Sequence, residues 1–599
     1  MIVKKIGDSV MTPLGFSLEE NFQAVMGGRS ALRRYDSLWN LPFPCFVSLI
    51  PDAALETEWK QEVNAADFPF LTTKFEKIAL ISAVKAVKQS GIDPKSERLV
   101  FILSSTKGNV ELLGDENSDM ERVTPAHTAQ LIADYFGNPN TPITVSNACI
   151  SGLCAQIEAF RCLQSGQYDT AVVIGADVLS PFIVAGFQSL KALSDEQCRP
   201  FSANRKGLNL GEAAAAVVYT VADDSADGWR MLAGAVRNDA NHISGPSRTG
   251  EGSYRALCSV LSDSGLTAND LACLNVHGTS TMYNDEMESI AINRAGLNAV
   301  PVNAMKGYYG HTLGAAGILE TLLTMRALEE GKVPATRGFD ELGVTNPVLV
   351  SAESLDTQKH AFVKLLSGFG GCNAAAGFTR LHDCTVTRLH GYTVTKHTVK
   401  LTPNYLEVNG KRVAEAVAGE SFLTMLYRKY NMDYPKFFKM DVLCKVGFVA
   451  SEILLVEEGA ERFVPRADRA VILFNRNSSL NADRTFQKTI VDPADFYPSP
   501  SVFVYTLPNI VTGEIAIRNK YHGESSFILL PEKSQEAMNQ AIARAFMDGE
   551  TTSVLTGWVE AVSETEYEVE MEIAIKDNAF AGEAEIPASY RRPEWCSAE

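Results

Sequence analysis

The sequence lacks several features that would place the protein in a membrane, in an oxidising compartment or on nucleic acid. It contains no run of about 18 apolar residues, and its first residues, MIVKKIGDSVMTPLG, lack the apolar core of a secretion signal. The 11 cysteines are odd in number and never spaced CxxC, which argues against a disulfide framework and a zinc knuckle. Basic residues are outnumbered, 54 against 72 acidic ones. We therefore expect a cytoplasmic protein that binds neither nucleic acid nor an anionic membrane.

The length and the order of local patterns predict a layered α/β protein with more than one domain. A chain of 599 residues exceeds what one hydrophobic core supports. Helix and strand patterns alternate through about the first 380 residues. Apolar residues from Leu153 to Leu163 recur every three or four positions, which predicts one face of a helix closed by Gly166. Short β-branched or apolar runs predict strands at 98–106, 170–178, 212–221, 230–238, 271–276 and 361–367.

The sequence contains an internal repeat. KFEKIALISAVK at Lys74 is echoed by KFFKMDVLCKVG at Lys436, and RLVFIL at Arg98 by RAVILF at Arg469. NACISGLCAQIEAF (147–160) and TAVVIGADV (170–178) find counterparts in the same order at 508–521 and 552–562. Four ordered matches predict that residues 400–599 copy the first 180 residues or so, after a Thr-rich connector at 383–399. In the copy, Ile510 stands where Cys149 stands in the original.

Cys149 lies in a small-residue turn directly before the predicted helix. A strand, a tight turn and a helix would place its sulfur at a helix N-terminus, where unpaired N–H groups and the helix dipole lower a thiol pKa. The alternative is a small, buried core residue, which is the commoner role of a free cysteine.

Two histidine turns and a glycine loop strengthen the nucleophile interpretation. His277 follows a predicted strand in NVHGTSTMYND, and His311 follows Lys306 in NAMKGYYGHTLGAAG. The segment LLSGFGGCNA follows another strand, and Gly368, Gly370 and Gly371 would let a backbone N–H approach a ligand.

These motifs, in this order together with RPFSANRKGLNLGEAAA, resemble the β-ketoacyl-acyl-carrier-protein synthases of the elongating, Cys-His-His type. The resemblance spans about residues 1–383. It implies a thiolase-like, layered α-β-α-β-α fold of two similar halves (1–225 and 226–383), with the site between them. Residues 400–599 would then be a third, incomplete half of the same fold, without catalytic function.

The resemblance also implies a role for each motif residue. Cys149 would take an acyl group from a carrier-protein thioester, and His277 and His311 would hold the thioester oxygen of malonyl-carrier protein during loss of carbon dioxide. The backbone N–H groups of Cys149 and Phe369 would form the oxyanion hole, with Phe369 as a gate. These are residue types that the chemistry needs, since a thiolate is both nucleophile and leaving group and imidazoles donate to an oxyanion without a metal. No metal or cofactor is expected.

Further residues are assigned by the same resemblance. Lys306 and Glu320 would form a buried pair that supports the second histidine, although a surface ion pair is the alternative. Thr279 and Thr281 match positions that meet the phosphopantetheine arm. Ile150 departs from the family's small residues and would shape the acyl channel.

The partners implied are acyl carrier protein bearing phosphopantetheine thioesters and, by analogy of fold, a homodimer or a heterodimer with a synthase-like subunit. The leading hypothesis is decarboxylative condensation in fatty acid, polyene (such as aryl polyene) or polyketide chain elongation. Two alternatives remain open: a chain-initiating malonyl decarboxylase or acyltransferase, and a non-catalytic chain-length partner or scaffold. Thiolases use a second cysteine as base and initiating synthases pair histidine with asparagine, so the second histidine motif favours elongation.

Overall fold

The computed structural model describes residues 2–63, 73–114, 119–223, 227–380, 392–430 and 432–577. The predicted boundaries at 225 and 383 and residues 383–391 of the predicted connector lie outside these residues. Within them, no helix is both long and apolar enough to cross a membrane.

Every helix and strand predicted from the patterns in the first 380 residues is confirmed. The helix after Cys149 is α5 (Ser151–Gln164), and Gly166 follows it with a φ of 71°. The strands are β4 (Leu99–Ser104), β6 (Thr170–Asp177), β8 (Ala213–Ala222), β9 (Arg230–Asn238), β10 (Leu271–Asn275) and β15 (Ala361–Gly368).

Two sheets with the same strand order form this part of the chain. The first runs β5 (Ile143–Val145), β4, β6, β8 and β1 (Ile2–Met11); its first three strands are parallel, and β8 is antiparallel to both of its neighbours. The second runs β11 (Pro301–Asn303), β10, β15, β16 (Cys372–Thr379) and β9 with the same directions. This part of the chain therefore has two similar halves, as expected.

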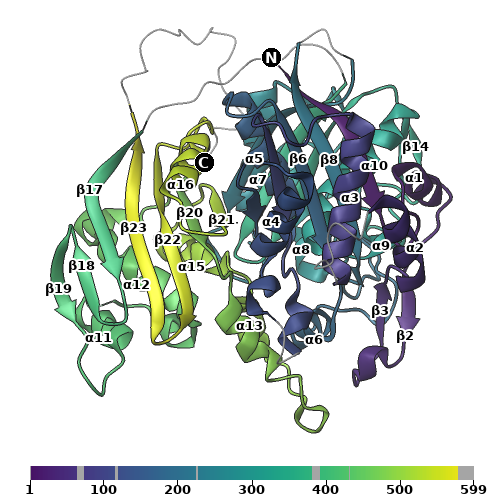
Figure 1. Ribbon diagram of the computed structural model, residues 1–599. Coiled ribbons are helices and arrows are strands. Elements are labelled where there is room, and N and C mark those ends of the chain that lie inside the picture. The colour runs from purple at the N-terminus through teal and green to yellow at the C-terminus, as the bar shows by residue number, and fades with distance from the viewer. Residues whose placement is uncertain are drawn as a thin grey trace.

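Helices separate and cover these two sheets. Helices α5 and α10 (Ala316–Glu329) lie between them and are buried along almost their whole length, whereas α3 (Lys74–Ser90) covers the outer face of the first sheet and α7 (Glu251–Ser264) that of the second. Helix α3 begins at a capping box, because Thr73 and Glu76 each bond the other's backbone N–H. The result is the predicted α-β-α-β-α layering (Figure 1).

A third sheet with this strand order lies in the C-terminal part. It runs β21 (Ser525–Leu529), β20 (Arg469–Asn475), β22 (Ser553–Ser563), β23 (Glu566–Lys576) and β17 (Tyr392–Leu401), and its first three strands are again parallel. Helices α12 (Val442–Leu454) and α15 (Ile510–Asn519) pack together and α12 covers this sheet. The repeated stretches at 469 and 552 are thus strands, like their counterparts at 98 and 170.

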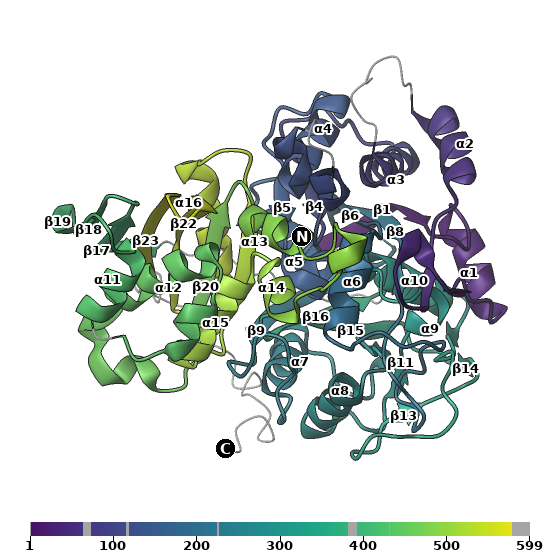
Figure 2. The same ribbon diagram turned by 90° about the horizontal axis from the view of Figure 1, so that it is seen from below.

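The C-terminal part joins the rest of the chain through a continuous sheet. Strand β21 pairs antiparallel with β5, so the edges of the first and third sheets meet. In Figure 1 this part, green to yellow, stands beside the purple-to-teal remainder, and Figure 2 shows α13 (Leu480–Gln487) and α14 (Pro500–Tyr505) between the two, near α6 (Pro181–Ser189).

Buried ion pairs cross this junction. Each has one partner on either side, and all eight side chains are at most 10% exposed. Burial of both charges makes such pairs sensitive to the loss of one partner, which costs about 3–5 kcal/mol. The pairs are Lys107–Asp483, Arg161–Glu524, Arg237–Asp548 and Glu158–Arg544.

Candidate active site

Cys149 sits in a strained turn at the start of α5. The short 3-10 turn Ala148–Ile150 leads directly into the helix, and Ala148 has a φ of 48°, in the left-handed region that residues with a side chain rarely adopt. The thiol is 7% exposed and lines a cavity. The predicted position of this sulfur, at a helix N-terminus and facing a cavity, is therefore confirmed.

His277 follows β10, and a buried carboxylate holds its turn. Glu288, on α8 (Met282–Arg294), accepts the backbone N–H groups of His277 at 2.7 Å and of Gly278 at 2.8 Å. Burial, reinforced by the nearby Asp285 carboxylate, raises the pKa of Glu288 to about 7. Glu288 therefore fixes the backbone from which the His277 ring projects.

His311 is held so that one defined nitrogen faces the cavity. Its backbone N–H donates to Asn209 at 2.7 Å, and its Nδ1 accepts the N–H of Leu313 at 3.3 Å. Since Nδ1 is an acceptor, the proton of the neutral ring lies on Nε2, which is buried and has no hydrogen-bond partner among the described residues. The ring thus presents an unused N–H donor.

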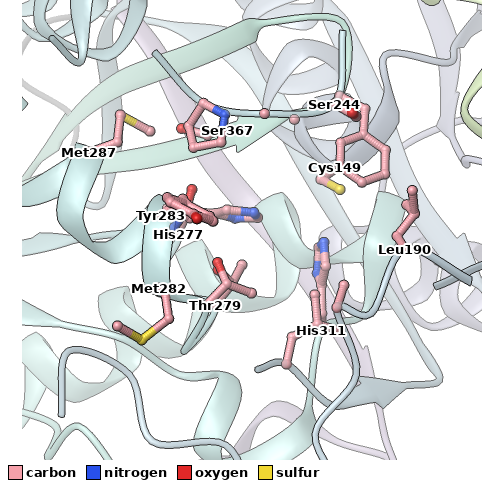
Figure 3. A pocket seen from close by; sticks show the side chains of 18 of the residues that line it. Cys149, Leu190, Ser244, His277, Thr279, Met282, Tyr283, Met287, His311 and Ser367 are labelled. Carbon is pink, nitrogen blue, oxygen red and sulfur yellow. The ribbon is translucent and has the colours of Figure 1, made fainter. Parts of the chain in front are cut away.

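The three groups converge on one space. Cys149 Sγ and a ring nitrogen from each histidine all lie within 4.8 Å of one another. The two imidazole centroids are 5.1 Å apart, with ring planes at 86° (Figure 3). The cavity that they line has a volume of about 350 Å³, within the range of small-molecule sites.

Burial sets the protonation of all three groups. It lowers the pKa of both imidazoles well below 6.5, and the positive charge of Lys306 acts in the same direction. Burial also raises the pKa of the Cys149 thiol to about 12, against the opposing effects of Lys306 and of the backbone N–H groups of Cys149 and Phe369. The backbone N–H groups do act to lower this pKa, as predicted, but the predicted net direction is wrong for the free protein because desolvation outweighs them. At neutral pH the site holds a thiol and two neutral rings.

The alkylation rate of Cys149 should consequently rise about tenfold per pH unit between about pH 6 and pH 9, because only the thiolate reacts and its fraction grows tenfold per unit below the thiol pKa. Mass spectrometry of the iodoacetamide adduct at Cys149 would measure this, with the Cys149→Ala chain as background. A rate that is flat over this range would contradict it, because it would require a thiolate–imidazolium pair.

Lys306 and Glu320 form the expected pair, and it is buried. Lys306 Nζ lies 2.9 Å from Glu320 Oε1, and both side chains are at most 3% exposed. Lys364 on β15, which the sequence reading missed, reaches the other oxygen, Oε2, at 2.5 Å. Burial would raise the pKa of Glu320, but the two ammonium groups together lower it, so the carboxylate stays ionised. The sequence did contain a sign of this buried charge, because Lys364 interrupts the apolar run AFVKLLS.

Only some of the remaining predicted site residues line the cavity. Phe369, Gly371, Thr279 and Thr281 line the cavity, and the two threonine hydroxyls are 2.9 Å apart. Ile150 does not line it, since its side chain is fully buried in the core between the sheets. Its expected place in an acyl channel is therefore not supported.

Gly370 also departs from its predicted place. It is absent from the described lining and faces the C-terminal part instead, because a Cβ built on it would lie 2.6 Å from the Asn509 amide nitrogen.

Comparison with known proteins places the chain among condensing enzymes. Residues 3–224 match "Beta-ketoacyl synthase, N-terminal domain" and residues 230–340 match "Beta-ketoacyl synthase, C-terminal domain". The chain is 28% identical to 3-oxoacyl-[acyl-carrier-protein] synthase 2 of Vibrio cholerae, over 63% of this chain and 98% of that one. It is 30% identical to the tetracenomycin polyketide synthase ketoacyl synthase alpha subunit of Streptomyces glaucescens, over 51% of this chain and 80% of that one.

One solved structure resembles almost the whole chain. The PfaC keto synthase–chain length factor covers 96% of this chain, with 78% of its own length covered, at a TM-score of 0.77 and 13% identity. At this identity the likeness concerns the fold alone, and it includes the C-terminal part.

Proposed function

Because this chain belongs to the β-ketoacyl synthase family, it is an acyltransferase of the condensing type, and we propose that Cys149, His277 and His311 carry its chemistry. The reaction is the decarboxylative Claisen condensation of an acyl-enzyme with malonyl-acyl-carrier protein, which elongates an acyl chain by two carbons. The single observation that supports this most is the convergence of the thiol and both imidazoles, from three distant parts of the sequence, within 4.8 Å in one cavity.

The first half-reaction loads the thiol. Cys149 Sγ attacks the carbonyl of an acyl-carrier thioester, the new S–C bond replaces the pantetheine S–C bond, and the thiol proton passes to the departing pantetheine sulfur. The backbone N–H groups of Cys149 and Phe369 both face this sulfur and are the proposed donors to the tetrahedral oxyanion. Thr279 and Thr281, on the cavity wall, are the proposed contacts of the pantetheine arm.

The second half-reaction forms the carbon–carbon bond. The bond between the malonyl carboxylate and its methylene carbon breaks, carbon dioxide leaves, and the electron pair becomes an enolate on the thioester oxygen. Neutral imidazoles suit this step, because each donates an N–H to the developing charge. The direction of His311 Nε2–H is already set, and no described residue accepts from it. The enolate carbon then attacks the acyl-Cys149 carbonyl, and the sulfur leaves and is reprotonated.

The buried Lys306–Glu320–Lys364 cluster has a proposed supporting role. The Lys306 charge contributes to the low pKa of both rings, so it favours the neutral donor form over imidazolium. Glu320 balances the two lysines and permits their burial.

We propose that residues 400–599, with the β17 strand before them, are a non-catalytic synthase-like half-module that takes the place of a partner subunit. Its strand order repeats that of the first half, and β21 occupies the edge of β5. The ring centroid of Phe503, in the half-module, lies 5.6 Å from that of Phe187, and Phe187 lines the cavity. The half-module would thereby limit the space for a growing chain, as a built-in chain-length and scaffold element.

Acyl carrier protein is the proposed macromolecular substrate. Lys191 and Lys206 lie among the cavity-lining residues and are exposed, as are the neighbouring Met282 and Tyr283. Basic residues at this rim suit an acidic carrier in an otherwise acidic protein.

Intact-mass measurement after incubation with acyl-acyl-carrier protein tests the enzymatic assignment. The native chain should gain the mass of one acyl group, and Cys149→Ala should gain none. Cys154→Ala is the matched control, because this buried cysteine lies in the first turns of α5, directly after the Cys149 turn, and is not among the cavity-lining residues; it should load normally. Equal labelling of Cys149→Ala and the native chain would remove Cys149 from its role, and no labelling of the native chain would favour the scaffold alternative.

A further inference from the structure

The loop that carries Phe369 is fastened to the C-terminal half-module by one side chain. Asn509, immediately before α15 and 1% exposed, donates from Nδ2 to the Phe369 carbonyl at 2.8 Å. The Cys372 thiol, a weak donor, also approaches this oxygen at 3.1 Å. The fit is close, because a Cβ on Gly513 of α15 would lie 2.6 Å from the Gly370 carbonyl oxygen.

The peptide unit after Phe369 is therefore held at both ends. Its carbonyl oxygen accepts from Asn509, and its N–H, on Gly370, donates to the Ile243 carbonyl at 2.6 Å. Gly370, whose N–H belongs to this unit, has a φ of 91°, and as a glycine it can adopt other backbone conformations. Without the Asn509 amide, a part-buried carbonyl would lose its only strong donor among the described contacts and the peptide unit could rotate.

The other proposed donor is tied to the same half-module by a separate element. Asn147, two residues before Cys149, donates to the Ser525 carbonyl at 3.0 Å and accepts from the Phe527 N–H at 3.0 Å. Both flanks of the sulfur, the Cys149 turn and the Phe369 loop, are thus held by residues more than 130 positions further along the chain.

We infer that Asn509 is a positioning residue for acyl transfer. It holds the Phe369 carbonyl, on the peptide unit next to the one that carries the Phe369 N–H, and so restrains the backbone that sets this N–H where the tetrahedral oxyanion forms at Cys149. This inference rests on the proposed function of that pair of N–H groups. It gives the inactive half-module a part in the chemistry besides bounding the pocket. The described hydrogen bonds that hold the two histidines come from Glu288, Asn209 and Leu313, which lie outside this loop, so decarboxylation of malonyl-carrier protein should proceed without Asn509.

The test compares Asn509→Ala with Asn519→Ala. Asn519 is a matched control, because it is buried on the same helix and its amide donates within that helix, to Ile515 at 2.9 Å. Amide hydrogen exchange over residues 366–373 measures how often the loop opens, whether or not the enzyme is active. Stopped-flow acylation of Cys149 and release of carbon dioxide from malonyl-carrier protein alone report the two chemical steps.

Asn509→Ala should raise exchange in this loop and slow acylation on the order of 10²-fold, the size expected for a misplaced oxyanion donor. Its decarboxylation rate should stay within about twofold of the native value, and Asn519→Ala should change neither. Unchanged loop exchange would overturn the inference, and so would faster exchange with normal acylation, or equal losses in both steps. If the native chain fails to acylate at all, the proposed function fails, while the exchange result still decides whether Asn509 holds the loop.

Discussion

A chain that ends at residue 383 is expected to self-associate more than the full chain and to condense acyl groups at least about 100-fold more slowly, since both flanks of the sulfur are then unsupported. Truncation uncovers the edge of β5, a row of unpaired backbone groups that promotes association. It also removes the partners of Asn147 and of the Phe369 carbonyl. Light scattering and turnover with acyl- and malonyl-carrier protein would measure both effects.

Supplying residues 384–599 as a separate chain is the control for this truncation. Because contact, rather than the covalent link, is what completes the site, co-expression of the two pieces should restore a one-to-one complex and most of the turnover. A truncated chain that is soluble, monomeric and as active as the full protein would defeat the proposed role of the half-module.

Replacing His311 by alanine is expected to slow malonyl decarboxylation about 10²- to 10³-fold, as removal of an oxyanion donor does in other enzymes. The Nε2–H of this ring is the donor whose direction the structure fixes, through the Leu313 N–H on Nδ1. Acylation of Cys149 should persist, because its oxyanion relies on backbone N–H groups. Carbon dioxide release and intact mass would separate the two steps.

Two variants sharpen the His311 experiment. His311→Asn retains an N–H donor and should lose less activity than His311→Ala. His127→Ala, on α4 (Pro125–Phe136) and outside the cavity lining, should behave as the native chain. Normal decarboxylation in His311→Ala would exclude this ring from enolate stabilisation.

The sequence was sufficient for six strands of the first two sheets, for helix α5 and for the three catalytic candidates. Strands such as β4 and β6 are short, apolar and wholly or almost wholly buried, so local pattern alone identifies them. Cys149, His277 and His311 were found because each lies in a turn of small residues, and turns of this kind admit a ligand. The repeat also indicated two strands of the third sheet, β20 and β22, in their correct order.

What could not be predicted depends on contacts between distant residues. The pairing of β5 with β21 and the Asn509–Phe369 bond join segments whose local patterns say nothing of each other. Lys364 was overlooked because its partner, Glu320, lies on another element. The thiol pKa was predicted in the wrong direction because the helix dipole is visible in a sequence, whereas the extent of desolvation is not.

The most direct measurement of the central claim is the ratio of β-ketoacyl product to carbon dioxide when the enzyme is given isotopically labelled acyl- and malonyl-acyl-carrier protein. A thiol and two imidazoles that act together in one cavity predict one product for each carbon dioxide released, and no product from the Cys149→Ala chain. Carbon dioxide without β-ketoacyl product, or product from Cys149→Ala, would contradict the account.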